Sequence, residues 1–139
     1  MKRTTPNDMT LLISRVLLAT LFLASGIGKL GAGYAATQDY MASGGVAGAL
    51  LPLVIALEIG GATALILGYF TRWTALALAA FSVATALLFH FAPGDAGQTT
   101  NLLKNFALAG GLLLLYAGGG GGLSLDAKRT RNHYRKELA

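Results

Sequence analysis

Four long apolar stretches are the feature that most restricts what this 139-residue chain can fold into. A helix that crosses the hydrocarbon core of a membrane, about 30 Å thick, needs roughly 20 mostly apolar residues. Stretches of about that length occupy residues 10–31, 50–70, 73–92 and 102–117. They predict an all-α polytopic membrane protein, a four-helix transmembrane bundle. A chain of this length is usually one domain, so residues 1–139 are predicted to form a single membrane domain.

The composition supports a membrane location and narrows the chemistry. Charged residues make up 12% of the chain, against about 25% in an average soluble domain. The formal net charge is +5, but the cations concentrate near the chain ends and leave the apolar middle almost bare. That distribution argues against a nucleic-acid partner. The chain has no cysteine, so it cannot form disulfides, thiolate metal sites or a cysteine redox centre.

Lysine and arginine near the ends of the apolar segments predict how the chain is oriented. The positive-inside rule places short basic loops in the cytoplasm. Residues 123–139 form a basic tail, the N-terminus is also basic, and Arg72 lies in the tight turn between the second and third segments. Asp39 and Asp95 lie in the two longer connectors. We therefore expect both termini in the cytoplasm and an even number of spans. The connector 34–48 is expected at the membrane interface, with a short helix.

Small residues predict how the helices pack. In lipid, helices associate through close backbone contact at glycine and alanine and through polar links, because burying apolar surface gains little there. In the second segment Gly60, Ala64 and Gly68 recur every four residues and form a small-residue ridge on one face. We expect this ridge to have a structural role in the bundle. Small residues on several faces also allow a homodimer.

Five charged side chains lie within or at the edges of the apolar segments: Arg15, Lys29, Glu58, Arg72 and Lys104. Arg72 and Lys104 are at segment ends, where long side chains reach water, and for Arg72 we expect a structural role. Glu58 is different, because it lies roughly 12 Å along its helix, close to the middle of the membrane. An ionised carboxylate there costs at least about 2.5–3.5 kcal/mol. Glu58 must therefore be neutral, paired with a cation or facing a wet cavity.

The positions of the other polar residues predict what surrounds Glu58. Arg15 and Lys29 fall on one face of the first helix, so both can point toward the same interior. Lys29, His90 and Lys104 with Asn105 lie at helix ends on one side of the membrane. We predict an apolar-walled vestibule with Glu58 at its floor, which suits a quinone head group, a small anion or a proton relay. The candidate ligand-binding residues are Glu58, Lys29, Lys104, Asn105, His90 and Arg15.

A second interpretation of Glu58 stays open at this point. A buried ion pair with arginine or lysine can fix the register of two helices without doing chemistry. The sequence contains no phosphate-binding loop, no metal-ligand spacing and no nucleophile–base pattern. We therefore predict no metal site and assign no catalytic residue.

Several short motifs, taken in order, resemble one protein family. They are Ser25–Leu30 (SGIGKL), Glu58–Gly61 (EIGG), Leu67–Arg72 (LGYFTR), Lys104–Asn105 (KN) and Gly122–Asp126 (GLSLD). Over about residues 11–126 the chain is similar to the DoxX family of small bacterial inner-membrane proteins. The resemblance implies four transmembrane helices and a place in the bacterial inner membrane. It also implies a link to quinone-dependent oxidation of sulfur compounds or to oxidative-stress complexes with partner proteins. A thiol role is not carried over, because the chain has no cysteine.

The residues and the resemblance together predict a membrane component that binds a quinone or similar small ligand beside Glu58. It would have no covalently bound cofactor and would serve a redox partner protein. A proton-coupled small-molecule transporter would use the same charges. A non-catalytic assembly or scaffold protein would use them to lock helices together, with the basic tail contacting anionic lipid or a partner. The sequence does not decide whether the protein is an enzyme.

Overall fold

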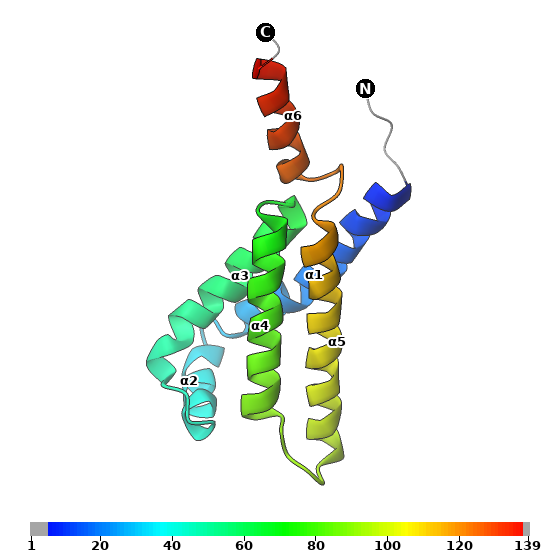
Figure 1. Ribbon diagram of the computed structural model, residues 1–139. Helices are drawn as coiled ribbons and strands as arrows, with labels where there is room; N and C mark the ends of the chain where they lie inside the picture. Colours follow the sequence, from blue (N-terminus) through cyan, green and yellow to red (C-terminus); the bar gives the residue numbers. More distant parts are fainter. Residues whose placement is uncertain (1–5, 138–139) are drawn as a thin grey trace.

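The computed structural model describes residues 6–137, and every regular element in this range is helical (Figure 1). The elements are α1 (Pro6–Gly28), α2 (Gly33–Ser43), the short 3₁₀ helix η1 (Gly48–Leu50), α3 (Leu51–Leu67), α4 (Thr71–Phe89), α5 (Ala96–Gly118) and α6 (Leu125–Glu137). The all-α prediction is confirmed for this part of the chain. The basic N-terminal residues Lys2 and Arg3 lie outside the described residues.

Three helical segments are long and apolar enough to cross a membrane: Asn7–Gly28, Gly48–Leu67 and Thr71–Phe89. They coincide with the first three predicted spans, so the prediction of a polytopic membrane protein is confirmed to that extent. Because the described helices provide three such segments, the fourth crossing stays a prediction.

The fourth predicted span corresponds to α5, which has 23 residues and differs from the prediction at its start. It begins at Ala96 rather than near residue 102. The Asp95 side chain caps this earlier start by accepting a hydrogen bond from the Gln98 backbone N–H at 2.9 Å. The added first turns are polar, which lowers the apolar character of the helix as a whole.

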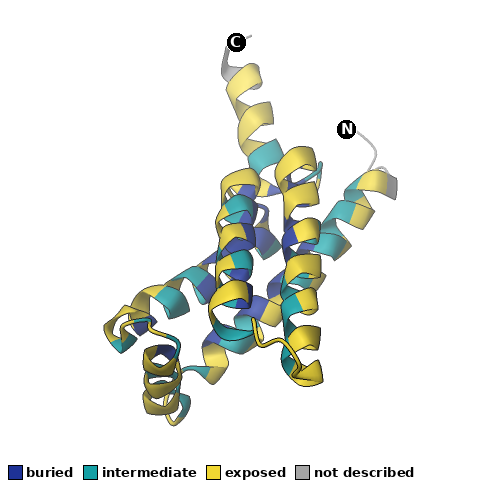
Figure 2. Ribbon diagram, turned by 60° about the horizontal axis from the view of Figure 1, so that its bottom comes forward, coloured by how far each residue is buried: buried dark blue, intermediate teal, exposed yellow. Residues whose placement is uncertain are grey.

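The long helices form two pairs that share one core (Figure 1). α1 packs mainly against α3, α4 packs along α5, and contacts between α3 and α4 join the pairs. The core is built from small and aliphatic side chains, including Leu65, Leu78 and Leu112. The outer faces of α4 and α5 are largely exposed (Figure 2). Leucines on the outside are highly exposed, with 68% of the surface of Leu53 in α3 and 75% of that of Leu114 in α5 accessible. An apolar exterior around an apolar core is the pattern of helices that face lipid.

The glycine of α3 that packs against a neighbouring helix is Gly61, one position after Gly60 of the predicted ridge. Gly61 is buried against α4, where a Cβ atom would lie 3.1 Å from the methyl carbons of Leu78. Gly60 is exposed, with open space where a Cβ would be. One residue turns a helix by about 100°, so neighbouring glycines face different surroundings. Gly60, Ala64 and Gly68 therefore do not form one contact face within this chain, because Gly60 faces outward and Gly68 ends the helix.

Gly68 ends α3 in the left-handed conformation, with φ of 67°. Arg15 of α1 lies against it and is fully buried. The Arg15 guanidinium donates to the backbone carbonyls of Leu65 at 3.3 Å and of Leu123 at 2.8 Å. The end of a helix presents unpaired carbonyls and a partial negative charge, which is the environment that a buried guanidinium needs. Arg15 thus connects α1 to the end of α3 and to the segment that follows α5.

Asp126, in the first turn of α6, completes this connection. Its carboxylate accepts hydrogen bonds from the backbone N–H groups of Phe70 and Thr71 and from the Thr71 hydroxyl, each at 2.8 Å. The Asp126 backbone N–H donates to the carbonyl of Gly68 at 2.9 Å. Asp126 therefore caps the start of α4 and fixes the start of α6 to the turn between α3 and α4. We call this cluster the arginine junction; it consists of Arg15, Gly68, Thr71 and Asp126.

The two short helices lie at opposite ends of the bundle (Figure 1). The expected short helix in the connector 34–48 is α2, and the tail 123–139, predicted only as polar, contains the helix α6. α2 contacts the end of α4, where the ring of Tyr40 stacks on that of Phe89 with centroids 5.1 Å apart. One end of the bundle is therefore closed by the arginine junction, and α2 lies beside the other.

Gly68→Ala should destabilise the fold. A Cβ at this position would collide with the Arg15 guanidinium and with Ser124, in a backbone conformation that alanine disfavours. We expect a loss of about 2–4 kcal/mol from strain and overpacking together, measured by reversible unfolding in detergent. Gly60→Ala is the matched control, because the added methyl group meets open space. Equal stability of the two variants would contradict the role of Gly68 in the arginine junction.

Candidate functional site

Glu58 lies in the middle of α3 and is buried, with 3% of its surface exposed. The end of α1 reaches it because Gly26 allows the two helices to approach. A Cβ at Gly26 would lie 2.7 Å from Ile59 Cγ1 and 3.1 Å from Glu58 Cβ. This close approach brings Ser25 and Lys29, which are one helical turn apart, to the carboxylate. A glycine contact between helices thus positions the polar site.

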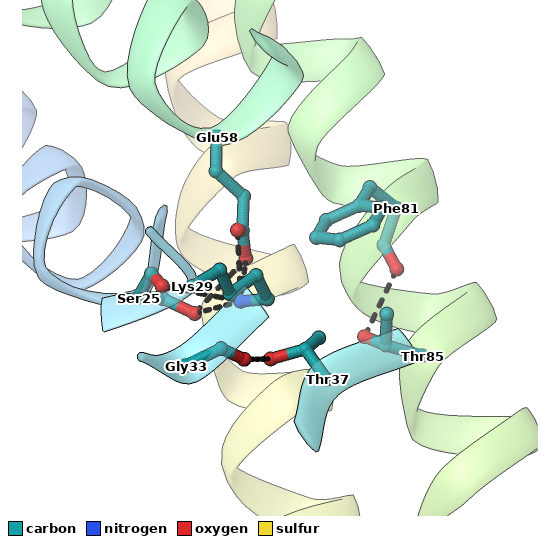
Figure 3. A network of polar contacts seen from close by, with 7 residues as sticks. All are labelled: Ser25, Lys29, Gly33, Thr37, Glu58, Phe81 and Thr85. Atoms are coloured by element: carbon teal, nitrogen blue, oxygen red, sulfur yellow. Dashed lines mark hydrogen bonds and ion pairs between the residues drawn. The ribbon is translucent and has the colours of Figure 1, made fainter. Parts of the chain in front are cut away.

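The predicted need of Glu58 for a partner is met by Lys29 (Figure 3). The Lys29 ammonium lies 2.9 Å from Glu58 Oε1 and 2.8 Å from Oε2. Ser25 Oγ donates to Oε1 at 3.0 Å and accepts a hydrogen bond from Lys29 Nζ at 2.6 Å. Glu58 Oε2 faces the ammonium but receives no hydrogen bond of suitable angle from the described residues. We call Ser25, Lys29 and Glu58 the polar triplet.

A cavity of about 390 Å³ opens beside the polar triplet. Its walls are mainly apolar and come from α1, α3 and α4, with Asn105 from α5 and with Thr37, Tyr40 and Met41 from α2. Ligand pockets are typically about 300–1,000 Å³, largely apolar, with a few polar groups that fix orientation. The cavity has this character, with one ion pair in an otherwise apolar surface. The remaining apolar lining includes Phe22, Val54, Phe81, Leu88 and Phe89.

Four of the six predicted ligand-binding residues line this cavity: Glu58, Lys29, His90 and Asn105. Lys104 is exposed and is not among the lining residues. Lys104 and Asn105 are neighbours on α5 and point about 100° apart, so only one of them faces the interior. His90 lies at the end of α4, where its Nδ1 is 2.8 Å from Gln98 Oε1.

Arg15 does not join Glu58, contrary to the prediction that both cations of α1 point at one site. Arg15 and Lys29 share a face but are 14 residues apart, or roughly 21 Å along the helix. Lys29 pairs with Glu58, whereas Arg15 lies in the arginine junction at the other end. Arg72 is exposed at the start of α4, beside that junction. The two ends of α1 thus anchor two separate polar clusters.

Sequence reasoning missed several residues of the site. Ser25 precedes Lys29 by four positions, and this spacing on a helix could have indicated it as a partner. Thr37, Tyr40 and Met41 line the cavity only because α2 packs beside the end of α4, and no local pattern indicates that packing. Among the described residues no group of three or more potential metal ligands comes together.

Removing one partner of the ion pair should cost more than removing both. Glu58→Met leaves the Lys29 ammonium without its counter-ion in a largely apolar environment, which we expect to cost about 3–5 kcal/mol. In the double variant Lys29→Met/Glu58→Met no buried charge is left, so most of that stability should return. Thermal unfolding in detergent, followed by circular dichroism, compares the three proteins. A double variant no more stable than Glu58→Met would show that the pair is not coupled in this way.

Known proteins share the part of the chain that contains this site. The family model described as DoxX matches residues 10–91, which include Lys29 and Glu58. Inner membrane protein YqjF of Escherichia coli (strain K12) is 44% identical over 120 residues, which cover 86% of this chain and 92% of that protein. Inner membrane protein YphA of the same strain is 35% identical over 129 residues, which cover 88% of this chain and 91% of that protein.

No solved structure matches the chain. The family match and both relatives confirm the resemblance that the motifs indicated. The membrane location follows from the same relatives and from the three apolar helices. The chain therefore belongs to the DoxX family and is an integral inner-membrane protein.

Proposed function

We propose that this protein binds a quinone, or a lipid-soluble molecule with a similar ring head, in the cavity beside Glu58. The observation that supports the proposal is the cavity itself, about 390 Å³ of mainly apolar space with one buried ion pair in its wall. Apolar walls favour the ring and its tail, and the polar triplet gives the ring a fixed direction. No covalent attachment is proposed, so the ligand exchanges with the membrane pool.

The exposure of the cavity walls supports a ligand that arrives from the bilayer. Leu21 of α1 and Leu88 of α4 both line the cavity, yet they expose 49% and 53% of their surface. The cavity is therefore continuous with an apolar outer surface of the kind that contacts lipid. A molecule dissolved in the acyl chains reaches the polar triplet without passing through water.

The proposed role is that of a binding component in a membrane redox or oxidative-stress system. The chain has no cysteine, so any thiol chemistry would come from a redox partner protein. The bilayer is itself a partner, since three helices are apolar enough to cross it. A homodimer through the outward small residues, such as Gly60, is part of the same proposal.

We also propose that α5 is the fourth membrane crossing and that both termini are cytoplasmic. α5 is 23 residues long, or roughly 34 Å at the rise of an α-helix, and returns the chain to the end where α1 begins (Figure 1). At that end Arg129 lies over the ring of Tyr69 at 5.4 Å, and Arg72 is nearby and exposed. The connectors at the other end contain Asp39 and Asp95. This charge distribution supports the proposed orientation.

The two alternative functions are a scaffold and a proton-coupled transporter. A scaffold role is favoured by the way Lys29 and Ser25 bind the Glu58 carboxylate, because such contacts lock α1 to α3. A proton-coupled transporter needs a polar route across the bundle. Ser124 lies beside the arginine junction. Apart from Ser124, the polar triplet and the junction, the buried polar side chain among the described residues is Ser82. Its hydroxyl donates to the Leu78 carbonyl. That core favours binding over proton transfer.

Filling the cavity should weaken quinone binding. Val54→Phe places an aromatic ring in the cavity lining, and we expect at least a tenfold weaker affinity because the ring competes for the ligand volume. The measurement is equilibrium binding of decylubiquinone to the protein in lipid nanodiscs, corrected with empty nanodiscs for partition into lipid. Leu53→Phe is the matched control, since Leu53 is adjacent but exposed outward.

Binding that is equal in the two variants, or absent from the native protein, would overturn the proposed site. Flux of a substrate into proteoliposomes that depends on Glu58 and on a pH gradient would favour the transporter instead. If substitution of Glu58 abolishes folding and the native protein binds no ligand, the scaffold role is favoured.

A further inference from the structure

The polar side chains around the cavity have largely used their hydrogen-bond donors on the protein itself. A lysine ammonium has three N–H donors and no acceptor. Lys29 Nζ donates to Glu58 Oε1 at 2.9 Å, to Ser25 Oγ at 2.6 Å and to the Ser25 carbonyl at 3.3 Å. The Ser25 hydroxyl in turn donates to Glu58. Neither Lys29 nor Ser25 therefore offers a free donor to a ligand.

The two threonines that line the cavity also use their hydroxyl donors on the protein (Figure 3). Thr37 Oγ1 donates to the Gly33 carbonyl at 2.7 Å, and Thr85 Oγ1 donates to the Phe81 carbonyl at 3.0 Å. Each hydroxyl has one donor and two acceptor lone pairs. These bonds to the helix backbone leave both threonines facing the cavity as acceptors.

His90 and Asn105 extend the pattern at the α4 and α5 side of the cavity. His90 Nδ1 lies 2.8 Å from Gln98 Oε1, a carbonyl oxygen that only accepts, so the tautomer that makes this hydrogen bond has its proton on Nδ1. In a neutral imidazole the other nitrogen, Nε2, is then an acceptor. Asn105 Nδ2 donates to the Asn101 carbonyl at 3.1 Å and keeps its side-chain oxygen as an acceptor. The unspent donors among the described lining side chains are the Tyr40 hydroxyl and the second N–H of Asn105.

Glu58 adds a charged acceptor to this lining. Its side chain lines the cavity but is only 4% exposed, and Oε2 is itself buried and lies 2.8 Å from the Lys29 ammonium. A carboxylate can accept about four hydrogen bonds, so Glu58 has capacity left after Lys29 and Ser25 have donated.

We propose that the cavity selects ring heads that donate hydrogen bonds, and therefore binds a hydroquinone more tightly than the quinone of the same ring and tail. This inference rests on the proposed function. The hydroxyls of a hydroquinone donate to the acceptors of this lining, which include the Glu58 carboxylate, Thr85 Oγ1 and the Asn105 side-chain oxygen. A quinone presents two carbonyl acceptors, which place like partial charges together.

The preference has a redox consequence. A quinone takes up two electrons and two protons to become the hydroquinone, and tighter binding of the product favours that reduction. Each tenfold preference raises the midpoint potential of the bound couple by about 30 mV. The site would therefore hold the ring as a better oxidant than it is in the free membrane pool. A reaction that oxidises a donor and passes two electrons to the quinone is the class of reaction that this site suits.

The test compares three ligands that differ in hydrogen bonding at the ring. Decylubiquinol is kept reduced under anaerobic conditions, decylubiquinone has acceptors only, and the dimethyl ether of decylubiquinol has the reduced ring without donors. With native protein in nanodiscs, we expect decylubiquinol to bind at least tenfold more tightly than either. Equal binding, or tighter binding of the quinone, overturns this inference and leaves the proposed function standing. Absence of binding by all three overturns the proposed function itself.

Variants identify the groups responsible. Glu58→Gln replaces a charged acceptor by an amide that also donates, so the preference for decylubiquinol should fall to about threefold or less. Tyr40→Phe removes a donor that only the quinone needs, so the preference should increase, and this variant keeps the ion pair intact if Glu58→Gln does not fold. Thr63→Val is the matched control, because Thr63 is exposed outside the cavity lining and its hydroxyl donates to the helix backbone in the same way. An unchanged preference in Tyr40→Phe, or a changed one in Thr63→Val, contradicts the donor argument.

Discussion

The ion pair between Lys29 and Glu58 is the constraint from which the rest of the site follows. A carboxylate near the middle of a membrane is too costly to leave ionised alone, and Lys29 at 2.8 Å supplies the opposite charge. The pair requires α1 and α3 to approach closely, and Gly26 makes that approach feasible. Both residues then lie at the edge of an apolar cavity.

The arginine junction solves the same problem by different means at the other end. Arg15 is fully buried, and backbone carbonyls rather than a direct carboxylate contact receive its hydrogen bonds. Asp126 then holds the turn between α3 and α4. This geometry explains why the motifs Leu67–Arg72 and Gly122–Asp126, distant in sequence, occur in one chain: each supplies groups that the other binds. Hydrogen bonds hold one end of the bundle together, and the cavity lies toward the other.

The sequence predicts the features that depend on local polarity. It does not predict those that depend on helix rotation and tertiary contacts. The apolar segments and the need of Glu58 for a partner follow from length, hydropathy and the cost of a charge in oil. The shared helix face correctly predicts that Lys29 points toward Glu58. It does not predict the position of Arg15, because the acceptors of Arg15 are backbone carbonyls at the end of another helix, which any sequence offers. Lys104 and Asn105 differ only by helix rotation, and α2 lines the cavity through packing that no pattern indicates.

The arrangement of helix pairs is consistent with the proposed binding role rather than with the alternative of transport. α1 with α3, and α4 with α5, are each closely packed, while the pairs are joined chiefly between α3 and α4. The cavity lies between the pairs on the α2 side, and exposed leucines such as Leu21 connect it to the lipid-facing surface. For the proposed ligand, apolar burial supplies the affinity for the ring and tail, and the polar triplet sets their direction. An apolar core, mainly of leucine and alanine, separates the triplet from the arginine junction.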